Sequence, residues 1–514
     1  MRLSYFSRLF CSLKPSLIRL FEVRLLIILV FCILHSCVFG QGYFKETQAI
    51  RDAYTDIVHL KLDSAKDQVA VIKKDDPNNL LILHLENYID FFTVFLNEEK
   101  EEFKRLEKNK KLRLRKIEKE GDRSSPYYLF VQAEINLQWA LVRAKFDQVF
   151  KAASESYNAY KLLTSNQKRF PDFIANKKSL SAIHVLVESI PGLVRKLFNI
   201  KGSIALGTKE IEEVIDYSEQ NDFLYRDEAI AIYSYILYHQ NNEKEKAWNY
   251  LVESELDPVA NPLACFLMST MAMKQGENDY AIELLANRPL GDEFAKFYYL
   301  EFMLGKAKLN RLDPESNIHF KNFINKFKGQ HYIKEAYQKL AWYELVVNNN
   351  NVPRYKLYMR QAQKEGEELI DGDKQAQKEA KRKSIPHPVL LKARLQFDGG
   401  YLQSAYRILI ENAHIFSSQN QHEIEYYYRL GRVTQALGNS FDAINYYNMV
   451  IQKGEKSDLY YPCNSSLQIA LIFEGQKNKR QAIRYFERCL DMQPSDYKNS
   501  LHQKAKSGLE RVKQ

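Results

Sequence analysis

The sequence predicts an all-α fold, a solenoid of stacked helix–turn–helix units. Pairs of small residues recur 12 positions apart along the chain, and neighbouring pairs follow one another at intervals of 34 to 39 residues where the pattern is clear. The helical periodicity is not interrupted by runs of alternating β-forming residues. Self-similarity at such a period is typical of stacked repeats.

The spacing of 12 has a packing reason. A first helix needs a small residue where its partner crosses closely, the partner returns a small residue at the same crossing, and a larger residue one turn later fills the space beside it. Gly431, Ala443 and Tyr447 form such a set, and Gly438 lies in the turn between them. We expect Gly438 to end a helix in the left-handed conformation and Gly431 to permit a close helix contact. The other sets are Ala53/Ala65/Val69, Tyr235/Ala247/Leu251, Ser269/Ala281/Leu285, Ala393/Ala405/Leu409 and Ala470/Ala482/Phe486.

Residues 1–40 have the pattern of an export signal. A basic stretch precedes the apolar run Leu25–Leu34, and Gly40 stands before a cut at Gln41. The run is short for a membrane span, which needs about 20 residues. Two alternatives stay open: an uncleaved anchor, and a bacterial lipoprotein signal in which Cys37 is lipidated and tethers the chain. No later stretch is long and apolar enough to span a membrane.

Composition and charge restrict the function. The 514 residues are 45% hydrophobic and 13% aromatic, enough for a large core. The formal net charge is +10, but residues 1–40 hold five basic residues and one acidic residue, which leaves about +6 for the rest. An excess this dilute is not the concentrated basic surface of a nucleic-acid binder. We therefore expect no nucleic-acid partner.

The organisation after the leader is uneven. Residues 41–383 are expected to form irregular, degenerate repeats, and residues 384–514 regular ones. Glu98–Pro126 is highly charged and is interpreted either as a long solvated helix or as a site for an acidic partner or lipid head groups. Asp371–Pro388 is interpreted as an exposed linker. Three cysteines remain after the leader; burial is expected for Cys489, and a Cys463–Cys489 bridge is the alternative.

Motifs that carry chemistry are missing from the sequence. The glycines around Gly431 lack the Lys and Ser or Thr of a phosphate-binding loop, and G-x-G-x-x-G, H-E-x-x-H and G-x-S-x-G runs do not occur. Histidine and cysteine are not clustered at metal-ligand spacing. We expect no catalytic residues, no cofactor and no metal.

The repeated segments, closest at Arg429–Pro494, resemble tetratricopeptide repeats, helical hairpins that stack into a right-handed superhelix. This resemblance implies a protein or peptide partner held in a concave groove lined by the first helices of the hairpins. Arg394 and Arg432 occupy equivalent places in successive units and are expected to form a short guanidinium ladder for carboxylates. The full set of expected partner-binding residues is Leu390, Arg394, Phe397, Tyr428, Arg432 and Gln435.

The sequence thus predicts an exported, non-catalytic scaffold for protein interactions in the cell envelope, periplasmic or associated with the outer membrane. Its partner is expected to be a protein or peptide, with an acidic segment as one option. Two alternatives stay open. The first is a glycan-binding outer-membrane lipoprotein of a nutrient-uptake system, and the second is an enzyme with a site hidden in residues 98–215.

Overall fold

The computed structural model confirms the predicted all-α solenoid. It describes residues 42–186, 202–239, 243–382, 384–416 and 422–513, so the predicted leader lies outside the described residues. Over these ranges the chain forms 24 α-helices and a short 3-10 helix, Ala413–Phe416, and its only β-pairing is two isolated bridges. Within the same ranges no helix combines the length and the apolar character needed to cross a membrane.

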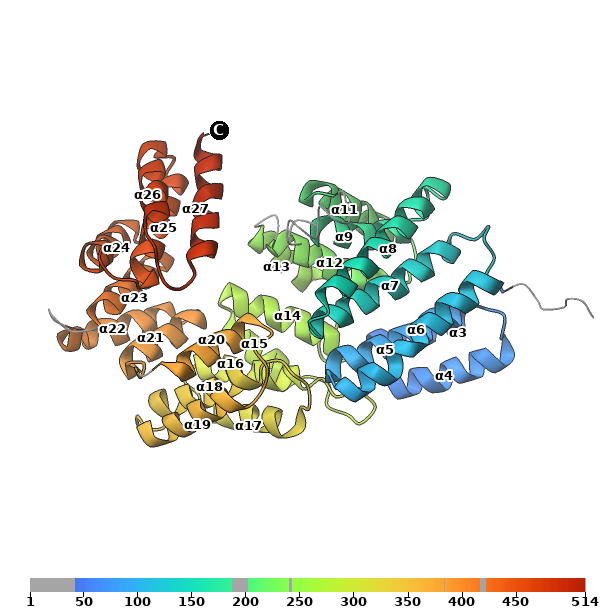
Figure 1. Cartoon of the computed structure of the whole chain (residues 1–514), viewed down its shortest axis with the longest axis horizontal. Coiled ribbons are helices and arrows are strands. Elements are labelled where there is room, and N and C mark those ends of the chain that lie inside the picture. The colour runs from blue at the N-terminus through green and yellow to red at the C-terminus, as the bar shows by residue number, and fades with distance from the viewer. Residues whose placement is uncertain (1–41, 187–201, 240–242, 383, 417–421, 514) are drawn as a thin grey trace, which may run out of the picture.

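The N-terminal helices, blue to green in Figure 1, occupy one end of the molecule. Neighbouring helices pack as the pairs α3/α4, α5/α6, α7/α8, α9/α11 and α12/α13. Their bounds are α3 (Gln48–Val58), α4 (Leu62–Asp75), α5 (Leu81–Asn97), α6 (Lys100–Glu120), α7 (Tyr127–Lys145), α8 (Val149–Arg169), α9 (Ala175–Leu186), α11 (Ile204–Gln220), α12 (Arg226–His239) and α13 (Lys244–Glu253).

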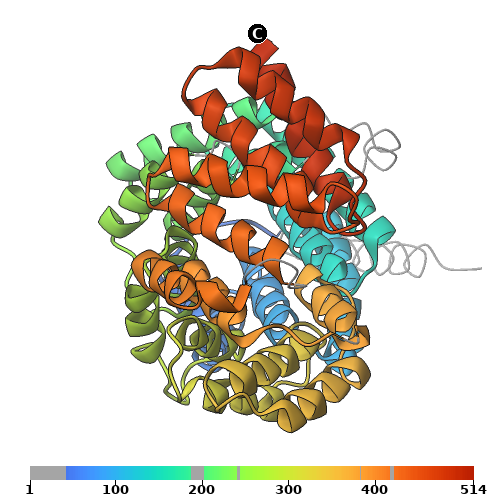
Figure 2. The same cartoon turned by 90° about the vertical axis from the view of Figure 1, so that its left-hand side faces the viewer.

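The middle and C-terminal helices continue the same pairing, with α20 as an additional helix and α27 as the last one. Turned by 90°, the green, yellow, orange and red helices follow one another around a spiral (Figure 2). Their bounds are α14 (Pro262–Gln275), α15 (Asn278–Ala286), α16 (Tyr299–Asn310), α17 (Ser316–Lys326), α18 (Ile333–Val346), α19 (Val352–Lys364), α20 (Asp371–Lys381), α21 (Pro388–Asp398), α22 (Leu402–Glu411), α23 (Glu423–Ala436), α24 (Ser440–Gly454), α25 (Tyr460–Gly475), α26 (Lys479–Asp491) and α27 (Lys498–Lys513).

The helix crossings follow the predicted register in most units. Gly438 ends α23 with φ +85°, in the left-handed region, and a Cβ on Gly431 would lie 2.6 Å from the ring of Tyr447. Both glycine predictions are therefore confirmed. The register was wrong at Tyr235, which is 41% exposed. Its neighbour Ser234 is the buried small residue of that unit.

Two segments differ from their predicted character. Asp371–Lys381 is not an exposed linker but helix α20, which buries Asp373, Ala376 and Gln377 against α18 and α19. Helix α6 is long and charged as expected, but it is not solvated on every side. It buries Phe103, Leu106 and Ile117 against α5 and α7.

Contacts between distant segments hold the spiral in shape. Glu98, in the turn after α5, accepts hydrogen bonds from the backbone N–H groups of Gln330 (3.2 Å) and His331 (3.1 Å) and from Lys145 Nζ (2.6 Å). Burial alone would raise the pKa of Glu98, but the hydrogen bond from His331 and the charge of Lys145 outweigh it and lower the pKa to about 2. The carboxylate thus joins the N-terminal helices to the loop before α18.

Packing is also continuous across residues 384–388, where the sequence places a domain boundary. Helix α21 contacts both α16 and α18, which precede that boundary. Nearby, the α14–α15 turn meets the α21–α22 turn so closely that a Cβ on Gly400 would lie 2.1 Å from the carbonyl oxygen of Gly276. The division into residues 41–383 and 384–514 stays a prediction about repeat regularity.

Candidate partner-binding groove

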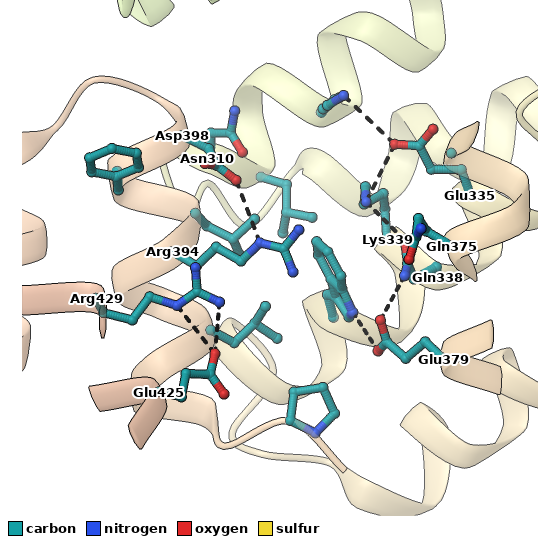
Figure 3. Close-up of a pocket in the computed structure, with 18 of the residues that line it drawn as sticks. Asn310, Glu335, Gln338, Lys339, Gln375, Glu379, Arg394, Asp398, Glu425 and Arg429 are labelled. Carbon is teal, nitrogen blue, oxygen red and sulfur yellow. Dashed lines mark hydrogen bonds and ion pairs between the residues drawn. The ribbon is translucent and has the colours of Figure 1, made fainter. Parts of the chain in front are cut away.

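A cavity of about 1180 Å³ lies among the first helices of six hairpins, α14, α16, α18, α21, α23 and α25, with α20 and the loop before α27 completing its lining. We call this cavity the C-terminal groove. Its position follows from the repeat, because the first helix of each hairpin faces the inside of the spiral. Figure 3 shows its central part.

Arg394, on α21, places its guanidinium in this groove. Its Cζ lies 4.8 Å from the ring centroid of Trp342, a cation–π contact between α21 and α18. Its Nε is 3.7 Å from the carboxylate of Asp398, one turn later on the same helix. The Arg394 side chain is 42% exposed. Arg394 is therefore fixed in direction by Trp342 but only loosely paired.

Opposite Arg394, α18 and α20 form a hydrogen-bonded wall (Figure 3). Glu379 accepts hydrogen bonds from Trp342 Nε1 (2.8 Å) and Gln338 Nε2 (2.6 Å). Lys339 donates to the Gln338 side-chain oxygen (2.9 Å) and pairs with Glu335 (3.4 Å). Burial lowers the pKa of Lys339 to about 8, although Glu335 counteracts part of the shift. The polar groups of this wall satisfy one another.

A second arginine, Arg429 on α23, pairs closely with Glu425 on the same helix, at 2.7 Å. Burial by itself would raise the pKa of Glu425, but the charges of Arg429 and Arg394 outweigh it and lower that pKa. Tyr461 adds a hydrogen bond to this carboxylate. The Glu425 carboxylate therefore stays ionised and occupies Arg429.

The loop between α26 and α27 closes one side of the groove. Asp496 in this loop forms ion pairs with Lys378 (3.3 Å) and Arg382 on and beside α20. The ring of Tyr497, the next residue, lies edge-on to Tyr460 with centroids 5.0 Å apart. An acidic side chain of the protein's own loop thus already lies against Arg382, a basic residue of the groove lining.

The structure separates the six residues expected to bind a partner. Arg394 and Phe397 line the groove, whereas Leu390 and Tyr428 are buried in the core, 1% and 2% exposed. Arg432 lies over the Phe397 ring, 4.9 Å from its centroid, and donates to the Tyr428 hydroxyl (3.3 Å). Gln435 accepts a hydrogen bond from Tyr447 (2.6 Å) and, like Arg432, is not among the lining residues.

The expected ladder of Arg394 and Arg432 therefore needs one correction, which concerns Arg432. Arg429 is the α23 arginine that lines the groove, because Arg432 leans toward the preceding repeat and covers Phe397. No pattern in the sequence indicates Trp342 or Asp496, because Trp342 lies in an irregular interval of the repeats and Asp496 lies in a loop. A signal for Arg429 was present in its spacing of four residues from Glu425.

The side chains that line the C-terminal groove are suited to binding another molecule. This lining combines aromatic rings with guanidinium, ammonium and carboxylate groups on a rigid helical frame. In the part of the chain that the structure describes, no three His, Cys, Asp or Glu side chains gather as metal ligands would. The absence of catalysis stays a prediction.

Comparison with known proteins supports the repeat assignment. Residues 465–496 match the family model described as tetratricopeptide repeat. These residues cover most of α25 and α26, so the chain carries a repeat of the superfamily that its sequence resembles, as predicted. A search of curated proteins found no match.

Two similar solved structures are titled "Structure of Naa15/Naa10 bound to HypK-THB" and "Crystal structure of APC/C hetero-tetramer Cut9-Hcn1". The first is 12% identical with a TM-score of 0.25 and covers 90% of this chain and 66% of its own. The second is 11% identical with a TM-score of 0.23 and covers 91% and 89%. At these TM-scores neither likeness bears on the function.

Proposed function

We propose that this protein is an exported scaffold of the cell envelope that binds a carboxylate-bearing segment of a protein partner in the C-terminal groove. The observation that carries the proposal is that Arg394 is exposed in the groove and only weakly paired with a carboxylate. It projects into a groove, is 42% exposed there, and has its nearest carboxylate at 3.7 Å. Arg429, by comparison, is held by Glu425 at 2.7 Å.

The size and lining of the groove suit a peptide. Small-molecule pockets usually have volumes of roughly 300–1,000 Å³, and this groove, at about 1180 Å³, is larger. Phe397 and the tyrosines of α25 offer apolar contact area, while Arg394 offers two N–H groups that a carboxylate can bind in parallel. The partner's backbone would lie along the groove, with an Asp, Glu or C-terminal carboxylate at Arg394.

The charge of the groove argues for one anchored carboxylate in place of a long acidic tract. Glu335, Glu379, Glu425 and Asp496 also belong to the lining, and a run of acidic residues would be repelled by them. A single carboxylate can displace the loose contact of Arg394 with Asp398 while the other ion pairs remain intact. We therefore propose a partner segment that a single carboxylate anchors at Arg394.

Site-specific photo-crosslinking tests this proposal. A photoreactive phenylalanine analogue is placed at Phe397 in the groove and, as a control, at Phe441 on α24, which is 75% exposed. We expect a peptide adduct from position 397 that is reduced by Arg394→Ala and unchanged by Arg407→Ala, a substitution of an exposed arginine on α22. Equal adducts from both positions, or an adduct insensitive to Arg394→Ala, would contradict the proposal.

A further inference from the structure

Two buried cysteines face each other in the last regular hairpin. Cys463 lies on α25 and Cys489 on α26, 1% and 0% exposed, and their sulfur atoms are 3.4 Å apart. Both are free thiols in the structure, as is the distant Cys265 on α14. No function described so far uses this pair.

We propose that Cys463 and Cys489 are a modification site that forms an intramolecular disulfide under oxidising conditions. A disulfide has its sulfur atoms about 2.05 Å apart, so the two sulfurs need to approach by little more than one ångström. Side-chain rotation can provide much of this approach because α25 and α26 are already packed together. The inference stands apart from partner binding, which it neither requires nor implies.

The oxidant is a small disulfide such as oxidised glutathione. The Cys463 thiolate attacks one of its sulfurs, forms a mixed disulfide and expels one glutathione thiolate. The Cys489 thiolate then attacks the Cys463 sulfur and expels the second. The two cysteine protons pass to the two glutathione thiolates, so the protein loses two electrons and two protons and the oxidant becomes two molecules of reduced glutathione.

The environment of the pair sets the order of these steps. A hydrogen bond from the Cys489 thiol lowers the pKa of Cys463 against the opposing effect of burial, and the same contact raises the pKa of Cys489. Cys463 is therefore the attacking residue. Helix α27 packs against α25 and α26 and adds Leu501 and Ala505 to the buried cluster that contains the pair, so the opening of this terminal helix gives an oxidant access.

The disulfide would also restrict the movement of one wall of the C-terminal groove. Tyr460 and Tyr461, which line the C-terminal groove, lie on α25 less than one turn before Cys463. A covalent link from Cys463 to α26 would hold this wall of tyrosines in place, independently of whether a partner is bound.

Peptide mapping tests the inference on the intact chain. The purified protein is equilibrated with oxidised glutathione, quenched in acid, unfolded, alkylated and digested with trypsin. We expect peptides 457–477 and 489–498 to appear as one linked species, two hydrogens lighter than their sum, while the Cys265 peptide is alkylated. Complete alkylation of Cys463 and Cys489, or a stable link of either to another cysteine, would overturn the inference.

Thermal unfolding provides a second measurement. A disulfide between Cys463 and Cys489 closes a loop of 26 residues and should raise the melting temperature of the oxidised wild type by about 5 °C. The same oxidant should give no such rise in Cys489→Ala, in which Cys463 can form only the mixed disulfide with glutathione. An equal shift in both proteins would show that oxidation acts elsewhere.

Discussion

Replacing Gly431 by alanine should destabilise the protein, although the same replacement at an open helix position is stabilising. The new Cβ would lie 2.6 Å from Tyr447 Cε1 and 2.7 Å from Cδ1. The ring cannot move aside easily, since Tyr447 is fully buried and its hydroxyl donates to Gln435 at 2.6 Å. Overpacking of this kind costs about 1–3 kcal/mol, and the gain in helix propensity offsets about 1 kcal/mol of it. The net loss in the free energy of unfolding is therefore up to about 2 kcal/mol.

Gly475→Ala is the matched control, because a Cβ at this position in α25 meets no atom within 4 Å. This variant should be unchanged or more stable by up to about 1 kcal/mol. Urea unfolding followed by far-ultraviolet circular dichroism measures the free energy of unfolding of each variant. The two values are compared only if the free energy depends on urea concentration with the same slope in both proteins. Equal stability of the two variants would refute the close crossing of α23 and α24 at Gly431.

The remaining predictions concern packing, pH and processing. Ala443→Leu should cost about 1–3 kcal/mol by overpacking, since Ala443 is fully buried, and its melting temperature should fall below that of wild type. Because the Glu98 pKa is lowered to about 2, its carboxylate stabilises the fold above about pH 4.5 and loses this effect as the pH falls toward 2. Glu98→Gln should therefore unfold at a lower urea concentration than wild type at pH 6, with a free energy of unfolding that is smaller by about 3 kcal/mol. This difference between the two proteins should be smaller at pH 3. A difference that stays the same at both pH values would contradict the lowered pKa of Glu98. Mass spectrometry of the mature chain should find Gln41 at its N-terminus, and a lipidated Cys37 would favour the tethered form instead.

Much of the fold could be predicted because helix crossings are encoded locally. A small residue, a turn and a second small residue 12 positions later define one hairpin, and Gly431, Gly438 and Ala443 all behave as this rule requires. The rule misplaced Tyr235 because the true small residue of that unit, Ser234, is 13 positions before Ala247. One additional residue in the connection shifts the register by about 100° around the helix.

Features that depend on contacts between distant segments could not be predicted. The charged stretch Asp371–Pro388 has the composition of an exposed linker, yet its residue Asp373 is buried and accepts hydrogen bonds from the backbone N–H groups of Tyr332 and Glu335 at the start of α18. Likewise, the repeat register brought Arg394 to the groove but carried no information on Trp342, its stacking partner. Local spacing specifies a hairpin, whereas these contacts arise from the curvature of the whole spiral.

The central claim, that Arg394 anchors a carboxylate of the partner, is tested most directly by a double-mutant cycle. The segment identified by crosslinking at Phe397 is synthesised with its carboxylate and as the matching amide, and each peptide is titrated against wild type and Arg394→Ala. We predict that either change alone weakens binding at least tenfold, about 1.4 kcal/mol, and that the second change then adds little. Independent, additive losses, or no loss with Arg394→Ala, would contradict the claim.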